Sequence, residues 1–223
     1  MTTVTKMRLS KETFNILKNF SSINSNIMIN PGNKLRTVSS GKNIFAEAVV
    51  QEEFDTQVAI WDLNKFLGVI SMFDNPDLEF HDTHVNISNG RSSVTYFYSE
   101  AALLTVPNRS PQMPEIMFSF DLDEEDLNDI LKASSVLQVS DLKIVAKDGM
   151  IKIVVNDMAN DTSNNFEITV SENYEGDDYD GTFKVSEIKF LPGSYNVSIT
   201  NTVISRFTHK SQNLTYYIAI NKV

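Results

Sequence analysis

The chain reads MRLSKETFNILKNFSSINSNIMI over residues 7–29, and a diverged copy of this segment appears in its second half. An offset of 113 residues places it over residues 122–136, LDEEDLNDILKASSV. The matched positions are Leu9, Phe14, Asn15, Leu17, Ser21, Ser22 and Ile23 on Leu122, Leu127, Asn128, Ile130, Ser134, Ser135 and Val136. Self-similarity at a fixed offset, together with a similar order of predicted elements, indicates an internal duplication.

Helices and strands are expected in the same order in both halves. Ser10 is a suitable N-cap for a helix over 11–20, and Asp62 for a second helix, LNKFLGVISMF. In the second half, an Asp at 121 or 123 precedes the helix LNDILKASS, and a short last helix is expected over 185–191. Runs rich in β-formers predict strands around these helices. The predicted fold class is α+β, with two similar domains of β-sheet and two helices in each.

A change in composition separates the two halves. The segment EAALLTVPNRSPQMP, residues 100–114, holds three of the six prolines and loses the periodic pattern of its neighbours. Proline fixes its own backbone and cannot extend a helix, so an extended connector is expected here. The predicted organisation is an N-terminal domain over 1–100, a connector over 101–114 and a C-terminal domain over 115–223.

Composition and charge restrict the class of protein. The 223 residues carry 19 basic and 29 acidic side chains, a net charge of −10, which argues against ordinary groove binding to nucleic acid. There is no cysteine, which excludes disulfides and cysteine-ligated metal sites. No apolar run is long enough to span a membrane, and the polar opening MTTVTK does not resemble a signal peptide. A soluble, cytoplasmic protein without membrane contact is expected.

Catalytic motifs are missing from the sequence. It contains no phosphate-binding glycine loop, no H-E-x-x-H zinc motif, no G-x-S-x-G elbow and no dinucleotide-binding G-x-G-x-x-G. We therefore predict no enzymatic activity, no cofactor and no metal. An enzyme with an unfamiliar site around the acidic loop 177–180 remains an alternative, which metal-dependent turnover would reveal.

Two clusters resemble metal sites but have simpler interpretations. His81 and His84 are expected to point to opposite faces of a strand, and zinc needs three or four convergent ligands. The loop 176–181, GDDYDG, partly fits an EF-hand, but its flanks are predicted strands, so a solvated turn is favoured. Acidic residues over 121–126 are typical of a helix N-terminus.

Each predicted helix places lysine opposite its apolar face. At about 100° per residue, Lys11 and Lys18 lie on one side of the first helix, while Ile16, Leu17 and Phe20 lie on the other. Lysine on the polar side of any single helix is unremarkable. The pattern gains meaning only if the fold places all of these faces on one surface.

Several segments together resemble the sliding clamps of T4-like bacteriophages, which are DNA polymerase processivity factors. The similar segments include the run at 7–29, FDTQVAIWDLNKFLGVISMF, DYDGTFKVSEIKFLPGSYNVSI and LTYYIAI. The similarity extends over nearly the whole chain from Met7 onward. About six residues, Met1 to Lys6, precede the matched start.

The resemblance implies a ring of six similar domains with helices around a central hole. A chain with two such domains would form a homotrimer closed by pairing of edge strands. Duplex DNA would pass through the hole without base readout, retained by topology. The resemblance suggests that the DNA-facing residues are Arg8, Lys11, Lys18, Lys65, Lys132, Lys184 and Lys189. The acidic opening of the helix after residue 121 weighs against a strong contact there.

The resemblance also implies a hydrophobic pocket for partner peptides near the connector. The residues nominated for it are Val106, Pro107, Met113, Pro114, Met117, Tyr217 and Ile218. The implied partners are the DNA polymerase, the clamp loader and late-transcription factors, in the cytoplasm of an infected host cell. The alternative is a β-rich phage structural or attachment protein with no role in tethering DNA, for which neither a basic inner face nor a twofold repeat is expected.

Overall fold

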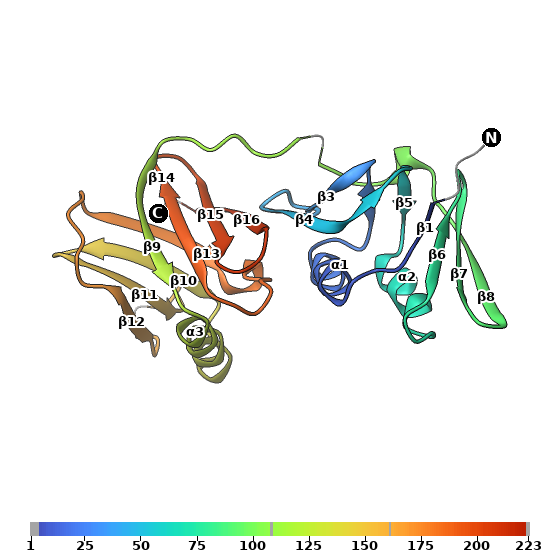
Figure 1. Ribbon diagram of the computed structural model, residues 1–223. Coiled ribbons are helices and arrows are strands. Elements are labelled where there is room, and N and C mark those ends of the chain that lie inside the picture. The colour runs from blue at the N-terminus through green and yellow to red at the C-terminus, as the bar shows by residue number, and fades with distance from the viewer. Residues whose placement is uncertain (1–4, 108, 161, 222–223) are drawn as a thin grey trace. The chain divides into compact units, whose positions relative to one another are not determined.

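The computed structural model describes residues 5–107, 109–160 and 162–221, and the chain divides into two compact units (Figure 1). Unit 1 is Met1–Ser110 and unit 2 is Pro111–Val223. The division falls inside 101–114, which stays the proposed connector. Residues 1–4 of the polar opening and Asn108 of the connector lie outside the described residues.

Unit 1 is built from antiparallel strands and two α-helices. Its described elements are β1 Thr5–Met7, α1 Lys11–Ile23, β2 Ile27–Ile29, β3 Gly32–Val38, β4 Ile44–Phe54, β5 Val58–Ile60, α2 Leu63–Ile70, β6 Asp77–Phe80, β7 His84–Asn89, β8 Ser92–Phe97 and the 3₁₀-helix η1 Ala101–Leu103. One sheet has the order β1-β6-β7-β8. In addition, β3 pairs with β4 and β2 with β5.

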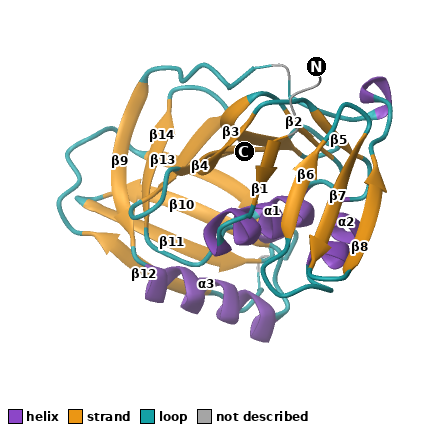
Figure 2. Cartoon of the chain, turned by 45° about the vertical axis from the view of Figure 1, so that its right-hand side comes forward, coloured by secondary structure: helices purple, strands orange, loops and turns teal. Residues whose placement is uncertain are grey.

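Unit 2 contains two four-stranded antiparallel arrangements and one α-helix (Figure 2). Its described elements are β9 Ile116–Leu122, α3 Glu124–Leu137, β10 Asp141–Lys147, β11 Met150–Asn156, β12 Phe166–Ser171, β13 Tyr179–Lys184, the 3₁₀-helix η2 Val185–Glu187, β14 Tyr195–Thr200, β15 Ile204–His209 and β16 Leu214–Ala219. The strand orders are β9-β14-β15-β16 and β12-β11-β10-β13.

The two units repeat one plan, in agreement with the predicted duplication. Each has a strand, a helix, four strands, a second helical segment and three strands. The first strand of each unit pairs with the sixth, as β1 with β6 and β9 with β14. The N-caps Ser10 and Asp123 also stand at the predicted offset. One matched pair differs, because Ile23 is buried whereas Val136 is 73% exposed.

Helix α1 is stabilised by an N-cap and by an apolar face at helical spacing. The Ser10 side chain accepts a hydrogen bond from the Thr13 N–H at 3.1 Å, which satisfies a donor that the first turn leaves free. Ile16, Leu17 and Phe20 then recur at helical spacing and are at most 1% exposed. Burial of each such side chain contributes about 1.5–3 kcal/mol. The apolar face of α1 therefore anchors the core of unit 1.

The prediction of a last helix over 185–191 is wrong in its length. Only Val185–Glu187 is helical, as a single 3₁₀ turn. Beyond it, the Phe190 ring packs against Tyr195, Phe207 and Tyr216, with centroids 4.7–5.1 Å apart. Packing of this half-buried ring against the three others outweighs continuation of the helix, and Pro192 follows two residues later. Among the described residues, unit 2 therefore has one α-helix, not two.

Two predicted loops are more ordered than expected. The acidic loop enters β13 at Tyr179, and Asp180 pairs with Lys143 at 2.5 Å. Part of this loop is thus a strand, which excludes the helix–loop–helix geometry of an EF-hand. The predicted connector begins with η1, and Leu104 behind it is only 9% exposed. Its first three residues are helical and exposed, and Leu104 is buried in unit 1.

Candidate nucleic-acid interface and partner surfaces

Unit 1 presents three lysines on two neighbouring helices. Lys11 and Lys18 are exposed on α1, and Lys65 is exposed on α2 opposite its buried residues. The Ser21 hydroxyl of α1 donates to the Asn64 side-chain oxygen of α2 at 2.8 Å, which joins the polar sides of the two helices. None of the three lysines forms an ion pair within the described ranges. This surface is referred to below as the unit 1 lysine face.

Arg8 differs from the other nominated cations of unit 1. Its Nε lies 2.7 Å from a carboxylate oxygen of Asp77, and Lys6 Nζ lies 3.1 Å from the other oxygen. The Arg8 guanidinium, followed by the Lys6 ammonium, lowers the pKa of Asp77. Exposed pairs of this kind contribute little to stability. The Asp77 carboxylate nevertheless offsets the charge that Arg8 would offer to a phosphate.

The N-terminus of α1 is occupied by a carboxylate of the same unit. Glu52 of β4 accepts hydrogen bonds from the Ser10 N–H and from the Thr13 hydroxyl. Partial burial opposes ionisation of Glu52, but these donors outweigh it, and the pKa is lowered. A negative charge at this position is also favoured by the helix dipole. Two backbone donors of this N-terminus are therefore already used, the Ser10 N–H by Glu52 and the Thr13 N–H by the Ser10 side chain.

Helix α3 of unit 2 has a mixed charge. Lys132 is exposed, but the first turn carries Glu124, Glu125 and Asp126. Partial burial and the neighbouring acidic side chains raise the pKa of Asp126, as expected where like charges crowd. A weaker attraction of the α3 surface for phosphate than of the unit 1 lysine face, as the sequence suggests, stays a prediction.

Lys184 is held by a buried carboxylate. It lies directly opposite Asp141 across the β10–β13 pairing, and its ammonium donates to that carboxylate. Asp141 is only 3% exposed and also accepts the Met158 N–H at 3.2 Å. Burial favours the neutral acid, but Lys184 and the Met158 N–H outweigh it, so the pKa of Asp141 is lowered. The geometry gives Lys184 a structural role, whereas the sequence suggested only DNA contact.

We expect Asp141→Asn to lower the free energy of unfolding at pH 7 by about 2 kcal/mol, since a charged buried hydrogen bond is lost. A lowered folded-state pKa stabilises the fold fully above the unfolded-state value of about 3.9. That contribution disappears as the pH falls through the folded-state pKa. The difference between wild type and variant in urea unfolding should therefore shrink below about pH 4. Asp177→Asn, in an exposed loop, is the matched control; a difference independent of pH would contradict this assignment.

The remaining nominated cation, Lys189, is half-buried. It follows η2 and directly precedes Phe190, and its N–H donates to the Glu187 carbonyl at 2.9 Å. Of the seven nominated cations, four are therefore exposed without an ion pair in the part of the chain that the structure describes. They are Lys11, Lys18, Lys65 and Lys132.

The nominated pocket residues do not form one set within a unit. Val106 and Pro107 belong to unit 1 and are half-buried, whereas the other five belong to unit 2. Tyr217 and Ile218 are consecutive on β16, so their side chains point to opposite faces of the sheet. Ile218 is 1% exposed and is a core residue, which makes its assignment to a partner surface wrong. Met117 of β9 is 45% exposed.

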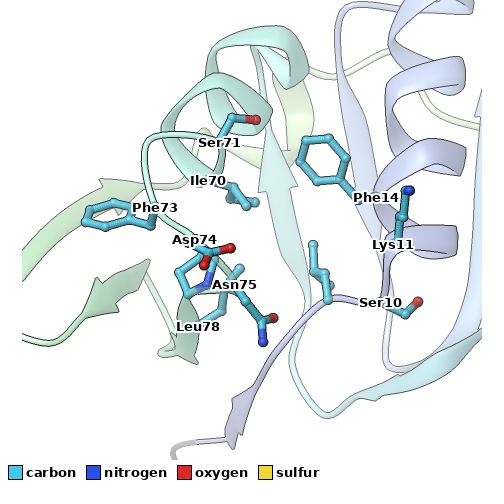
Figure 3. Close-up of a pocket in the computed structure, with 11 residues that line it drawn as sticks. Ser10, Lys11, Phe14, Ile70, Ser71, Phe73, Asp74, Asn75 and Leu78 are labelled. Carbon is cyan, nitrogen blue, oxygen red and sulfur yellow. The ribbon is translucent and has the colours of Figure 1, made fainter.

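A cavity that the sequence did not indicate lies at the start of α1. Its volume is about 350 Å³, and Figure 3 shows Lys11 and Phe14 on one side and Ile70, Phe73 and Asp74 on the other. In unit 2 the corresponding loop is 188–194, between η2 and β14. Its Phe190 ring packs against Tyr216. Because the two loops differ in length and sequence, the duplication alone gives no signal for this cavity.

His81 and His84 lie together, contrary to the expectation of opposite faces. Their rings stack with centroids 4.4 Å apart, because the chain turns between β6 and β7 and is not a continuous strand there. Among the described residues, no three His, Asp or Glu side chains gather as metal ligands would. No helix in the described ranges is long and apolar enough to cross a membrane.

Comparison with protein families finds a match in each half. A model described as DNA polymerase processivity factor matches residues 10–103, and one described as gp45 sliding clamp, C terminal, matches residues 119–222. The sliding clamp of Escherichia phage RB69 is 31% identical over 222 residues, which cover 96% of each chain. That of Vibrio phage KVP40 is 31% identical, covering 96% of this chain and 98% of that one. That of Enterobacteria phage T4 is 33% identical over 86% of each chain.

Solved structures extend the likeness to cellular proteins. The PCNA2–PCNA3 complex of Sulfolobus tokodaii matches with a TM-score of 0.69 and 13% identity, covering 98% of this chain and 99% of that chain. The DnaN sliding clamp of Bartonella birtlesii matches with a TM-score of 0.74 and 15% identity, covering 100% of this chain and 66% of that chain. At such low identity these matches show the fold alone, which is that of the DNA clamps.

Proposed function

This chain belongs to the sliding-clamp family of phage DNA polymerase processivity factors, and we propose that three copies of it close into a ring around duplex DNA. It tethers DNA polymerase to the template for processive synthesis. The family acts as a scaffold for other enzymes. The number three follows from two clamp units per chain and the six similar domains that the resemblance implies. The alternative of a structural phage protein is set aside, because the three phage relatives are all sliding clamps.

Ring closure is assigned to two exposed sheet edges. Among the described residues, β8 pairs with β7 alone in unit 1, and β12 pairs with β11 alone in unit 2. An unpaired edge presents free N–H and C=O groups and is normally covered or blunted. Pairing of β8 in one copy with β12 in the next would cover both edges in every copy. The closed symmetry then ends the assembly at a ring.

The unit 1 lysine face is assigned to the DNA. Lys11, Lys18 and Lys65 are exposed, come from two joined helices and lack carboxylate partners in the described chain. Lysine is a flexible point charge, which suits phosphate contact without base readout. Lys132 adds a weaker contact beside the acidic turn of α3. These four residues are the observation that carries the proposal.

Net charge sets how DNA enters the ring. Three chains at −10 each give −30, which repels free DNA at long range. Retention must therefore come from closure around the duplex and not from attraction. A clamp loader that opens the ring is accordingly a proposed partner, and late-transcription factors are proposed users of the same docking surface as the polymerase.

Two measurements test the proposal. Light scattering should give about 75 kDa for three chains of 25.1 kDa. Clamp loaded onto a nicked circular plasmid should remain bound through gel filtration and be lost once the plasmid is linearised, because a ring slides off free ends. Uncut circles incubated in parallel are the control. A monomeric mass at every micromolar concentration, or equal retention on linear DNA, would contradict the ring.

A further inference from the structure

The only tryptophan of the chain is on the surface. Trp61 follows the buried strand β5 and directly precedes Asp62, the N-cap of α2. Its side chain is 56% exposed, although the residues on either side of this turn, Ile60 and Leu63, are fully buried. An indole is the largest apolar side chain, and its exposure leaves a considerable area to be covered by something else.

Trp61 lies beside the free edge of the unit 1 sheet. The Tyr96 hydroxyl of β8 donates to the Asp62 carbonyl at 3.2 Å, and the Tyr96 and Phe66 rings meet at 5.1 Å. Figure 2 shows β8 at the margin of its sheet with α2 behind it. These contacts fix the start of α2, and hence Trp61, near the C-terminal end of β8.

Unit 2 has an apolar cavity beside its own free edge. The cavity has a volume of about 410 Å³ and is lined by α3 and by the start of β12. Its apolar wall includes Leu137, Phe166 and Val136, the last of which is 73% exposed. Asp129 and Lys132 of α3 form its polar rim. The cavity therefore lies at the N-terminal end of β12.

We propose that Trp61 of one copy inserts into the Val136 cavity of the next copy. The proposal rests on the ring proposed above and names the side chain that anchors its interface. Within each unit, the strand pairings are antiparallel. The same pairing between copies places the C-terminal end of β8 opposite the N-terminal end of β12. Those are the ends at which the indole and the cavity lie.

Opposite charges lie beside the two sites. Lys65 of α2 comes shortly after Trp61, and Asp129 stands two turns before Val136 on α3, on a rim that also carries Lys132. Both are exposed, and neither forms an ion pair within the residues that the structure describes. A buried aromatic anchor with a charged rim is the arrangement in which a few residues carry most of an interface's affinity.

The single indole makes the proposal directly measurable. Emission of Trp61 in the intact chain should move to shorter wavelength, and acrylamide quenching should fall, over the concentration range in which light scattering reports assembly. Dilution should reverse both changes. Val136→Glu and Trp61→Ala should each weaken assembly by about 30-fold, as expected for a central interface residue. Val203→Glu, at another exposed valine of unit 2, is the matched control and should leave assembly unchanged.

The outcomes separate this inference from the ring itself. A trimer whose Trp61 emission stays that of an exposed indole overturns the insertion and leaves the ring standing. Blue-shifted emission at dilutions where the chain is monomeric also overturns it, because the indole is then covered within one copy. A chain that stays monomeric throughout overturns both. Assembly weakened equally by Val136→Glu and Val203→Glu would remove the special role of the cavity.

Discussion

Replacement of both Lys11 and Lys18 by Glu should shorten the products of processive synthesis on long primed templates by about tenfold, with assembly intact. The two residues are exposed on α1, and the apolar face that anchors this helix is untouched. The change moves the charge of each chain from −10 to −14, all of it on the unit 1 lysine face. Repulsion then replaces attraction wherever the duplex approaches α1.

The control for this charge reversal lies in the same unit. Lys34 and Lys42 are exposed, and their replacement by Glu gives the same net charge away from α1 and α2. Product length on primed circles should be near that of wild type for this control. Raising the salt concentration should shorten products less for the α1 variant, since fewer lysine–phosphate contacts remain to be screened. Equal losses in both variants would assign the effect to net charge and not to the lysine face.

Met117→Glu should weaken binding of the polymerase by about 30-fold while leaving the ring on DNA. Met117 is nominated for the partner pocket, is 45% exposed on β9 and is therefore replaceable without loss of core packing. A charge in an apolar docking site costs about 2 kcal/mol or more when an anchor is lost. Calorimetry with the polymerase, or with its clamp-binding peptide, measures the change.

Met158→Glu is the matched variant for this experiment. Met158 is 38% exposed in the loop after β11 and was not nominated for a partner surface. Polymerase affinity should be unchanged there. If Met117→Glu bound polymerase as tightly as Met158→Glu, the pocket would have to be sought elsewhere, and the cavity beside Phe14 and Phe73 would be the next surface to test.

The elements that could be predicted from the sequence are those decided by a few neighbouring residues. The Ser10 cap and the spacing of Ile16, Leu17 and Phe20 are contained in a few neighbouring residues, and the first helix formed as expected. The repeat at offset 113 extended such signals to the plan of both units.

Long-range pairing explains what the sequence could not predict. No feature of the neighbouring sequence distinguishes Arg8 and Lys184 from Lys11. Each nevertheless forms an ion pair with a carboxylate on a strand distant in the sequence. Asp141 reaches Lys184 only through the register of β10 with β13, which no neighbouring residue specifies. Phe190 similarly ended a predicted helix because of rings contributed by three later strands.

The carboxylate of Glu52 at the head of α1 has a consequence for movement along DNA. Backbone N–H groups are rigid, directional donors and hold a phosphate at one fixed point. In the proposed ring, Glu52 withholds the Ser10 N–H from the duplex, and phosphate contacts would come mainly from ammonium groups on flexible stems. Such contacts exchange from one phosphate to the next with little change in energy. In the proposed ring, Glu52 would thus remove a fixed phosphate contact that would otherwise slow sliding behind the polymerase.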